Sequence, residues 1–110
     1  MSEYVSIKAE VLQKLNDHMP EIRERFGIET LGIFGSVARG EDTEESDVDV
    51  LYDFQDGRGN MYSFSHFTEY IENLLGRKTD FVSLKWMTPR FRQYVEPDMI
   101  LLGAVTDKIH

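Results

Sequence analysis

An α+β fold, in which helices pack on one small mixed β-sheet, is predicted by three observations. Apolar residues recur at steps of three and four within residues 4–19 and 61–75, which is the period of amphipathic helices. Residues 28–34, 46–54 and 80–84 are shorter and have the composition of strands. The order of these segments is typical of helices that cover one sheet.

The first two elements are helices. Residues 4–19 carry one apolar stripe, and its members are Tyr4, Ile7, Val11, Leu15 and Met19. Pro20 suits the first turn of a second, short helix, with Glu21 and Glu24 near its positive end. Gly27 is expected to end this second helix.

Two strands and a tight turn follow. Residues 28–34 (IETLGIF) are too short and too β-rich for another helix. Gly35 then allows close backbone approach, and residues 36–39 begin a short helix. Residues 46–54 (SDVDVLYDF) alternate aspartate with valine and then turn apolar, as in a strand. DGRGN at residues 56–60 is expected to be a turn or loop.

The second half of the chain also contains helices and strands. Residues 61–75 form an amphipathic helix that ends at Gly76. Residues 80–84 (DFVSL) are a third strand, and residues 88–95 a short helix. Residues 99–103 (MILLG) are either a last strand or a buried turn.

Composition limits the class of protein. The chain has 110 residues, so we expect a single domain over residues 1–110. Twelve Lys and Arg against 20 Asp and Glu give a net charge of −8, which disfavours nonspecific binding of nucleic acid. The absence of cysteine excludes disulfides and thiolate metal sites. No basic-apolar leader or membrane-spanning run is found, so a cytoplasmic location is expected.

Asp47 and Asp49 are the first candidate metal ligands. Alternate side chains of a strand share a face, so both carboxylates point into one space while the intervening valine faces the core. Two such carboxylates repel each other, and a divalent cation relieves the conflict. Hard oxygen ligands favour Mg²⁺ or Mn²⁺ over Zn²⁺. We expect the acidic residues just upstream to form a solvated loop: Glu41, Asp42, Glu44 and Glu45.

The turn before these aspartates is a candidate phosphate site. Gly35 lets a ligand approach the backbone, and Ser36 offers a hydroxyl donor at the start of a short helix. Arg39 either contacts phosphate or pairs with Glu41 or Glu45. An anion site directly upstream of a cation site is explained best by a triphosphate that arrives with Mg²⁺.

GSVARG at residues 35–40, followed in order by DVD at residues 47–49, resembles the signature of polymerase-β-like nucleotidyltransferases. It looks most like their minimal nucleotidyltransferase family. The family has a third carboxylate in a sequence like grkvDlv, and GRKTDFVS at residues 76–83 puts Asp80 in that place, with Thr79 where an aliphatic residue is usual. The resemblance covers residues 28–84 and implies the polymerase-β-like nucleotidyltransferase fold.

The resemblance also implies a Mg²⁺-dependent transfer of AMP from ATP to a hydroxyl. Asp47 and Asp49 would hold the ion that binds the triphosphate, and Asp80 would join them at a second ion and accept the hydroxyl proton. Two such ions lie about 3.5–4 Å apart and stabilise the attacking and leaving oxygens. Gly35 and Ser36 would hold the β- and γ-phosphates.

The short chain leaves little room for an acceptor pocket. Proteins of this family resemble antitoxins that transfer AMP to a tyrosine of a HEPN-family RNase toxin, which makes such a toxin the expected partner. Two alternatives stay open: a non-catalytic module that masks its partner, and an enzyme acting on a small hydroxyl compound such as an aminoglycoside.

Four further side chains have less specific expectations. Asp53 is interpreted as a strand-end residue. Trp86, Phe91 and Tyr94 are expected in the core or on a small apolar face, with nucleobase stacking as a weaker possibility.

Overall fold

Four strands form one mixed sheet in the order β3-β2-β1-β4 in the computed structural model, which describes residues 3–103. β1 pairs antiparallel with β2 and with β4, and β2 pairs parallel with β3. The strands are β1 (Ile28–Phe34), β2 (Val48–Phe54), β3 (Thr79–Ser83) and β4 (Ile100–Leu101). The helices are α1 (Lys8–Asp17), α2 (Met19–Phe26), α3 (Gly35–Arg39), α4 (Met61–Leu75) and α5 (Pro89–Val95). The predicted α+β fold with a mixed sheet is confirmed.

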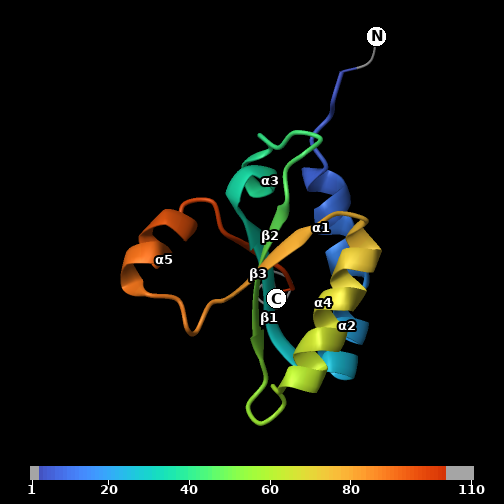
Figure 1. The fold of residues 1–110 in the computed structure, drawn as a ribbon, viewed down its shortest axis with the longest axis vertical. Helices are drawn as coiled ribbons and strands as arrows, with labels where there is room; N and C mark the ends of the chain where they lie inside the picture. Colours follow the sequence, from blue (N-terminus) through green and yellow to red (C-terminus); the bar gives the residue numbers. More distant parts are fainter. Residues whose placement is uncertain (1–2, 104–110) are drawn as a thin grey trace, which may run out of the picture.

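The helices lie on both sides of the sheet, but more of them cover one face than the other. Helices α1, α2 and α4 cover one face, and α5 stands off the other (Figure 1). Val48 and Val50 face the three helices and are buried in the main apolar core. Since side chains alternate along a strand, Asp49 and Asp53 point to the opposite face, which we call the outer face of the sheet.

Most element boundaries follow the sequence signals. β1 and α4 have the predicted bounds, and the side chain of Asn60 caps α4 by accepting a hydrogen bond of 2.8 Å from the backbone N–H of Ser63. Gly27 ends α2 in the left-handed conformation with φ +73°.

Two boundary predictions need correction. The expected helix at residues 4–19 begins only at Lys8, and Met19 opens α2 instead of ending α1. The strand predicted at residues 46–54 begins at Val48, so Asp47 lies one residue before it. Within residues 3–103, no helix is both long enough and apolar enough to cross a bilayer.

Candidate active site

The turn from β1 into α3 lies directly against a carboxylate. Gly35 has φ +77°, a conformation that favours glycine, and Phe34 before it pairs in register with Asp49 of β2. A Cβ atom added to Gly35 would overlap the Oδ2 atom of Asp49. The glycine therefore lets the Asp49 carboxylate approach the backbone of the turn.

The three predicted carboxylates meet at the neighbouring ends of β2 and β3. Asp49 and Asp80 are register partners on the parallel pair, and Asp47 lies two residues before Asp49. Asp47 and Asp49 are half-buried, whereas Asp80 is exposed. In the described part of the chain, none of the three carboxylates accepts a side-chain hydrogen bond or forms an ion pair. The three aspartates predicted from the sequence thus lie near one another, and no Lys or Arg side chain of the described residues pairs with their carboxylates.

Electrostatics confirm that these carboxylates act on one another. Burial raises the pKa of Asp49 above its ordinary value, and the charges of Asp80 and then Asp47 raise it further. The charge of Arg39 acts in the opposite direction but does not reverse the shift. The surroundings of Asp49 therefore penalise the negative charge of its carboxylate.

The donor set fits a hard divalent cation that brings ligands of its own. Among residues 3–103, no three His, Asp or Glu side chains are gathered tightly enough to form a metal cage by themselves. Mg²⁺ is commonly bound by one or two carboxylates, with waters and substrate phosphates completing its coordination. Open carboxylates beside an anion-accepting turn match that mode better than a closed protein cage.

The side chains of Ser36 and Arg39 differ in whether they are free to contact a bound ligand. The Ser36 hydroxyl makes no hydrogen bond to another residue of the described chain, so it is available to a ligand. Arg39 is already paired: its Nε lies 3.0 Å from Glu41 and its Nη1 lies 2.8 Å from Asp98. These hydrogen bonds, to Glu41 first and then to Asp98, raise the pKa of Arg39. The Glu41 pairing was one of the two predicted alternatives, and the Asp98 pairing was not predicted.

Asp42 does not belong to a solvated loop, and that prediction is wrong. Its side chain is only 6% exposed and accepts hydrogen bonds from the Tyr4 hydroxyl at 2.6 Å, from the Ile7 amide at 3.1 Å and from the Ser6 hydroxyl. Burial alone would raise the pKa of Asp42, but these hydrogen bonds, from Ser6 first, lower it below its usual value. Asp42 thus fastens the segment before α1 to the loop that leads to β2.

Arg77 holds the same loop from the other side. Its Nη2 donates to the backbone carbonyl oxygens of Thr43 at 2.8 Å and Ser46 at 2.9 Å, and its Nη1 to the Tyr4 hydroxyl at 3.4 Å. Ser46 directly precedes Asp47, and Arg77 lies three residues before Asp80. Arg77 therefore couples the two segments that carry the candidate ligands, a role that nothing local in the sequence indicates.

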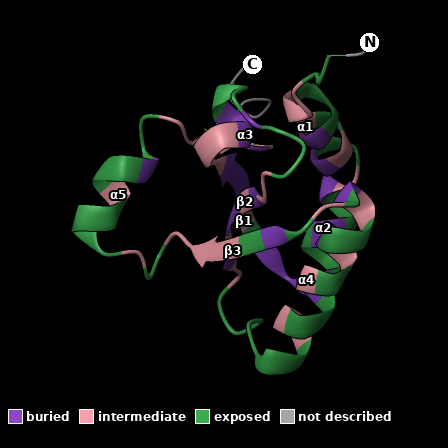
Figure 2. Ribbon diagram, turned by 45° about the horizontal axis from the view of Figure 1, so that its top comes forward, coloured by how far each residue is buried: buried purple, intermediate pink, exposed green. Residues whose placement is uncertain are grey.

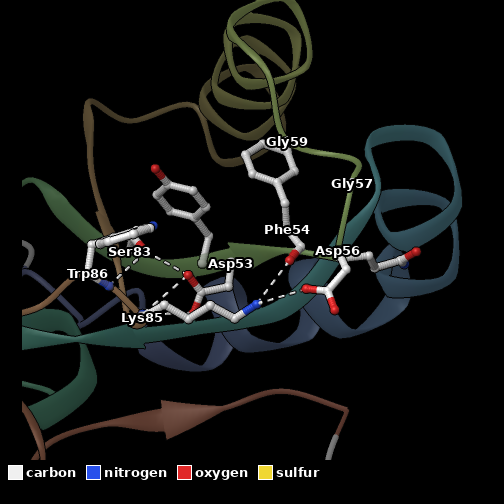
Figure 3. A pocket seen from close by; sticks show the side chains of 10 residues that line it. Asp53, Phe54, Asp56, Gly57, Gly59, Ser83, Lys85 and Trp86 are labelled. Atoms are coloured by element: carbon white, nitrogen blue, oxygen red, sulfur yellow. Dashed lines mark hydrogen bonds and ion pairs between the residues drawn. The ribbon is translucent and has the colours of Figure 1, made fainter.

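Asp53 shares the outer face with Asp49 but has a separate environment. Its buried carboxylate accepts hydrogen bonds from the Ser83 hydroxyl at 2.6 Å and the Lys85 amide at 3.0 Å (Figure 3). It lines a surface pocket of about 490 Å³ together with Lys85 and Trp86. The prediction of a strand-end residue outside the metal site agrees with this placement.

Comparison with known proteins identifies the family of this site. A family model described as polymerase beta, nucleotidyltransferase, matches residues 9–103. The chain belongs to this nucleotidyltransferase family. The match includes the turn at Gly35 and all three aspartates, so the predicted relationship and the predicted enzyme class are both confirmed.

Individual relatives place this nucleotidyltransferase more closely. Protein adenylyltransferase MntA of Thermococcus cleftensis is 45% identical over 73 residues, which are 66% of this chain and 73% of that protein. A solved structure of a candidate minimal nucleotidyltransferase superposes with a TM-score of 0.69 at 35% identity and covers 83% of this chain and 92% of its own.

A more distant structure shares the fold. It holds a tri-AMPylated HEPN toxin of Shewanella oneidensis in complex with an MNT antitoxin, and the matching chain superposes with a TM-score of 0.58 at 15% identity. The match covers 87% of this chain and 76% of that chain.

Proposed function

We propose that this nucleotidyltransferase is a Mg²⁺-dependent protein adenylyltransferase, and that it acts as the antitoxin of a HEPN-family toxin by attaching AMP from ATP to a tyrosine of that toxin. One observation carries the chemical part of the proposal: the Asp49 carboxylate lies against the Gly35 turn and beside Asp80, with no bonded cation of the protein's own. The divalent cation that arrives with the triphosphate would supply the missing positive charge.

Each residue of the site has a role in this proposal. Asp47, Asp49 and Asp80 would hold the divalent cation, and the Gly35 backbone and Ser36 hydroxyl would hold the terminal phosphates of ATP. When bound, the cation would withdraw electron density from the phosphoryl oxygens and neutralise charge on the leaving pyrophosphate. Arg39 already donates from Nε to Glu41 and from Nη1 to Asp98, so its Nη2 is the nitrogen that could donate to a phosphate without breaking either bond.

The transfer itself is a single displacement at the α-phosphorus of ATP. The acceptor hydroxyl oxygen forms a bond to the α-phosphorus, and the bond from that phosphorus to the bridging oxygen of the β-phosphate breaks. Pyrophosphate leaves, and the hydroxyl proton passes to a base. Asp80 is the candidate base because its carboxylate is exposed and lies beside Asp49 on the neighbouring strand.

A protein acceptor is supported by three considerations. The relative from Thermococcus cleftensis is named a protein adenylyltransferase, and the distant neighbour is the antitoxin of an AMPylated HEPN toxin. A chain with net charge −8 is poorly suited to hold a nucleic-acid acceptor. An ATP-dependent reaction on another protein also fits the expected cytoplasmic location.

The decisive experiment combines the protein with a HEPN-family protein from the same organism, ATP and Mg²⁺. Intact-mass spectrometry should show the addition of AMP to the HEPN protein and none to a variant with its target tyrosine changed to phenylalanine. Asp47→Asn/Asp49→Asn should abolish the addition. A HEPN protein that stays unmodified would refute the proposal, and a modification-dead variant that still neutralises the toxin would favour a masking module instead.

A further inference from the structure

Three aromatic side chains are exposed on the segment that carries α5. Trp86 is 86% exposed, Tyr94 77% and Phe91 41%, so of the two predicted placements, the core and a small apolar face, the structure agrees with the apolar face. Figure 2 shows α5 as a mostly exposed helix that projects from the body of the molecule. A cluster of large exposed apolar groups commonly marks an interaction site. We call Trp86, Arg90, Phe91 and Tyr94 the α5 surface.

The charge of this segment is opposite to that of the whole chain. Residues 85–95 contain Lys85, Arg90 and Arg92 and no Asp or Glu, although the chain carries a net charge of −8. Arg92 is paired with Glu96 at 2.6 Å, and Lys85 lies 3.4 Å from Glu29. Arg90 has no ion-pair partner within residues 3–103. The α5 surface therefore offers aromatic rings together with an available cation.

The α5 surface is also fixed next to the candidate active site. The ring of Phe91 meets the ring of Phe34 edge-on, with 6.3 Å between their centroids, and Phe34 directly precedes the Gly35 turn. At the other end, Asp98 pairs with Arg39, the last residue of α3. A molecule that contacts Phe91 would consequently lie beside the turn, whereas Trp86 lies at the other end of the α5 surface, in the pocket that Asp53 lines.

We propose that the α5 surface is the docking site for the acceptor protein, which binds through an acidic patch next to its target hydroxyl. Tryptophan, tyrosine and arginine are the residues that most often dominate binding at protein interfaces. The positive charge complements an acidic partner and would guide its approach to the site. The proposal rests on the proposed function, because it assumes that the acceptor is a protein.

Other occupants fit the observations less well. A nucleic acid could stack on the aromatic rings, but its phosphates would lie beside Asp49 and Asp80, whose charges repel them. A second copy packed symmetrically through the same surface would bring two positive segments together. A protein whose acidic patch contacts Arg90, and whose uncharged target hydroxyl faces the carboxylates, avoids both conflicts.

The test compares Trp86→Ala/Tyr94→Ala and Arg90→Glu with Tyr62→Ala, which removes an equally exposed aromatic ring from α4. The probe is the same HEPN-family protein as in the transfer experiment, changed from tyrosine to phenylalanine at its modification site so that only binding is measured. We expect the double variant to bind about 30-fold more weakly and Arg90→Glu about tenfold more weakly at low salt. Tyr62→Ala should bind within about twofold of wild type.

Folding and nucleotide binding are checked separately. All three variants should keep the thermal stabilisation by Mg²⁺ and ATP, because none of the changed residues touches the carboxylates or the turn. If wild type modifies the HEPN protein and the double variant binds it equally well, the docking proposal alone is overturned. If wild type neither binds nor modifies it, the proposed function fails and the docking proposal fails with it. Loss of self-association or of RNA binding in the double variant, with HEPN binding intact, would also overturn the docking proposal.

Discussion

Replacing Gly35 by alanine should separate the chemistry of the turn from its backbone strain. Alanine at φ +77° must adopt the left-handed conformation, which costs roughly 1–2 kcal/mol. Its Cβ would in addition overlap the Asp49 carboxylate. To reach an ordinary van der Waals separation, that carboxylate would have to retreat by about 1 Å or slightly more.

A displacement of this size is small for the fold and large for catalysis. Misplacing a reacting or positioning group by 1 Å can slow a reaction about 100-fold, so Gly35→Ala should lower AMP transfer by that factor. The assay is initial-rate transfer at saturating Mg²⁺ and ATP, accompanied by chemical denaturation of the metal-free protein.

Gly57→Ala is the matched control for this experiment. Gly57 has φ +79°, and a Cβ added there would meet nothing within 4 Å. It should therefore show the backbone cost of roughly 1–2 kcal/mol without the loss of transfer. If the two variants lose equal stability and both transfer AMP at the wild-type rate, the inferred contact between Gly35 and Asp49 has no role in catalysis.

Three further changes test other parts of the site. Asp49→Asn should raise the free energy of unfolding of the metal-free protein at pH 7 while abolishing transfer. Because the pKa of Asp49 is raised in the folded state, wild type should gain stability as pH falls from about 7 toward about 4. Denaturation curves recorded with EDTA should show that the variant lacks this gain. Asp42→Ala should lower the free energy of unfolding by about 2–4 kcal/mol in chemical denaturation, against about 0.5 kcal/mol or less for Glu44→Ala. Because the pKa of Asp42 is lowered in the folded state, its contribution to the free energy of unfolding should vanish as pH falls below about 4. Arg77→Ala should lower transfer about tenfold and raise the ATP concentration needed for half-maximal rate. Arg58→Ala removes one hydrogen bond to a distant carbonyl oxygen and should leave both quantities unchanged. Equal kinetics in these two arginine variants would exclude a positioning role for Arg77.

The sequence predicted those features that depend on local chemistry. The alternation of aspartate and valine placed Asp49 on the outer face and Val48 in the core, as the structure has them, because the period of a strand is independent of what packs on it. Glycines at helix ends set the bounds of α2 and α4 for a similar reason, since few other residues adopt the required backbone conformation.

The remaining features depend on contacts between distant parts of the chain. Asp42 looked like one acidic loop residue among several, and only the approach of Tyr4 and Ser6, 36 or more residues away, distinguishes it. Arg77 donates to backbone carbonyl oxygens, which every residue possesses, so no side-chain pattern can indicate its targets. Trp86 was predicted to lie either in the core or on a small apolar face. The sequence could not decide between the two, because burial requires a neighbouring element that the described part of the fold does not supply.

The attachment of Tyr4 and Ser6 to Asp42 makes the segment before α1 a support of the loop that leads to Asp47. Residues 3–6 belong to no helix or strand, and hydrogen bonds to Asp42 order them where an untied terminal segment would be poorly ordered. Removing residues 3–6 would take away two of the three groups that donate hydrogen bonds to Asp42, and also the Ser6 hydroxyl that accepts from the Lys8 amide at the start of α1. The position of the loop before Asp47 therefore depends on side chains that lie 36 or more residues before Asp42 in the sequence.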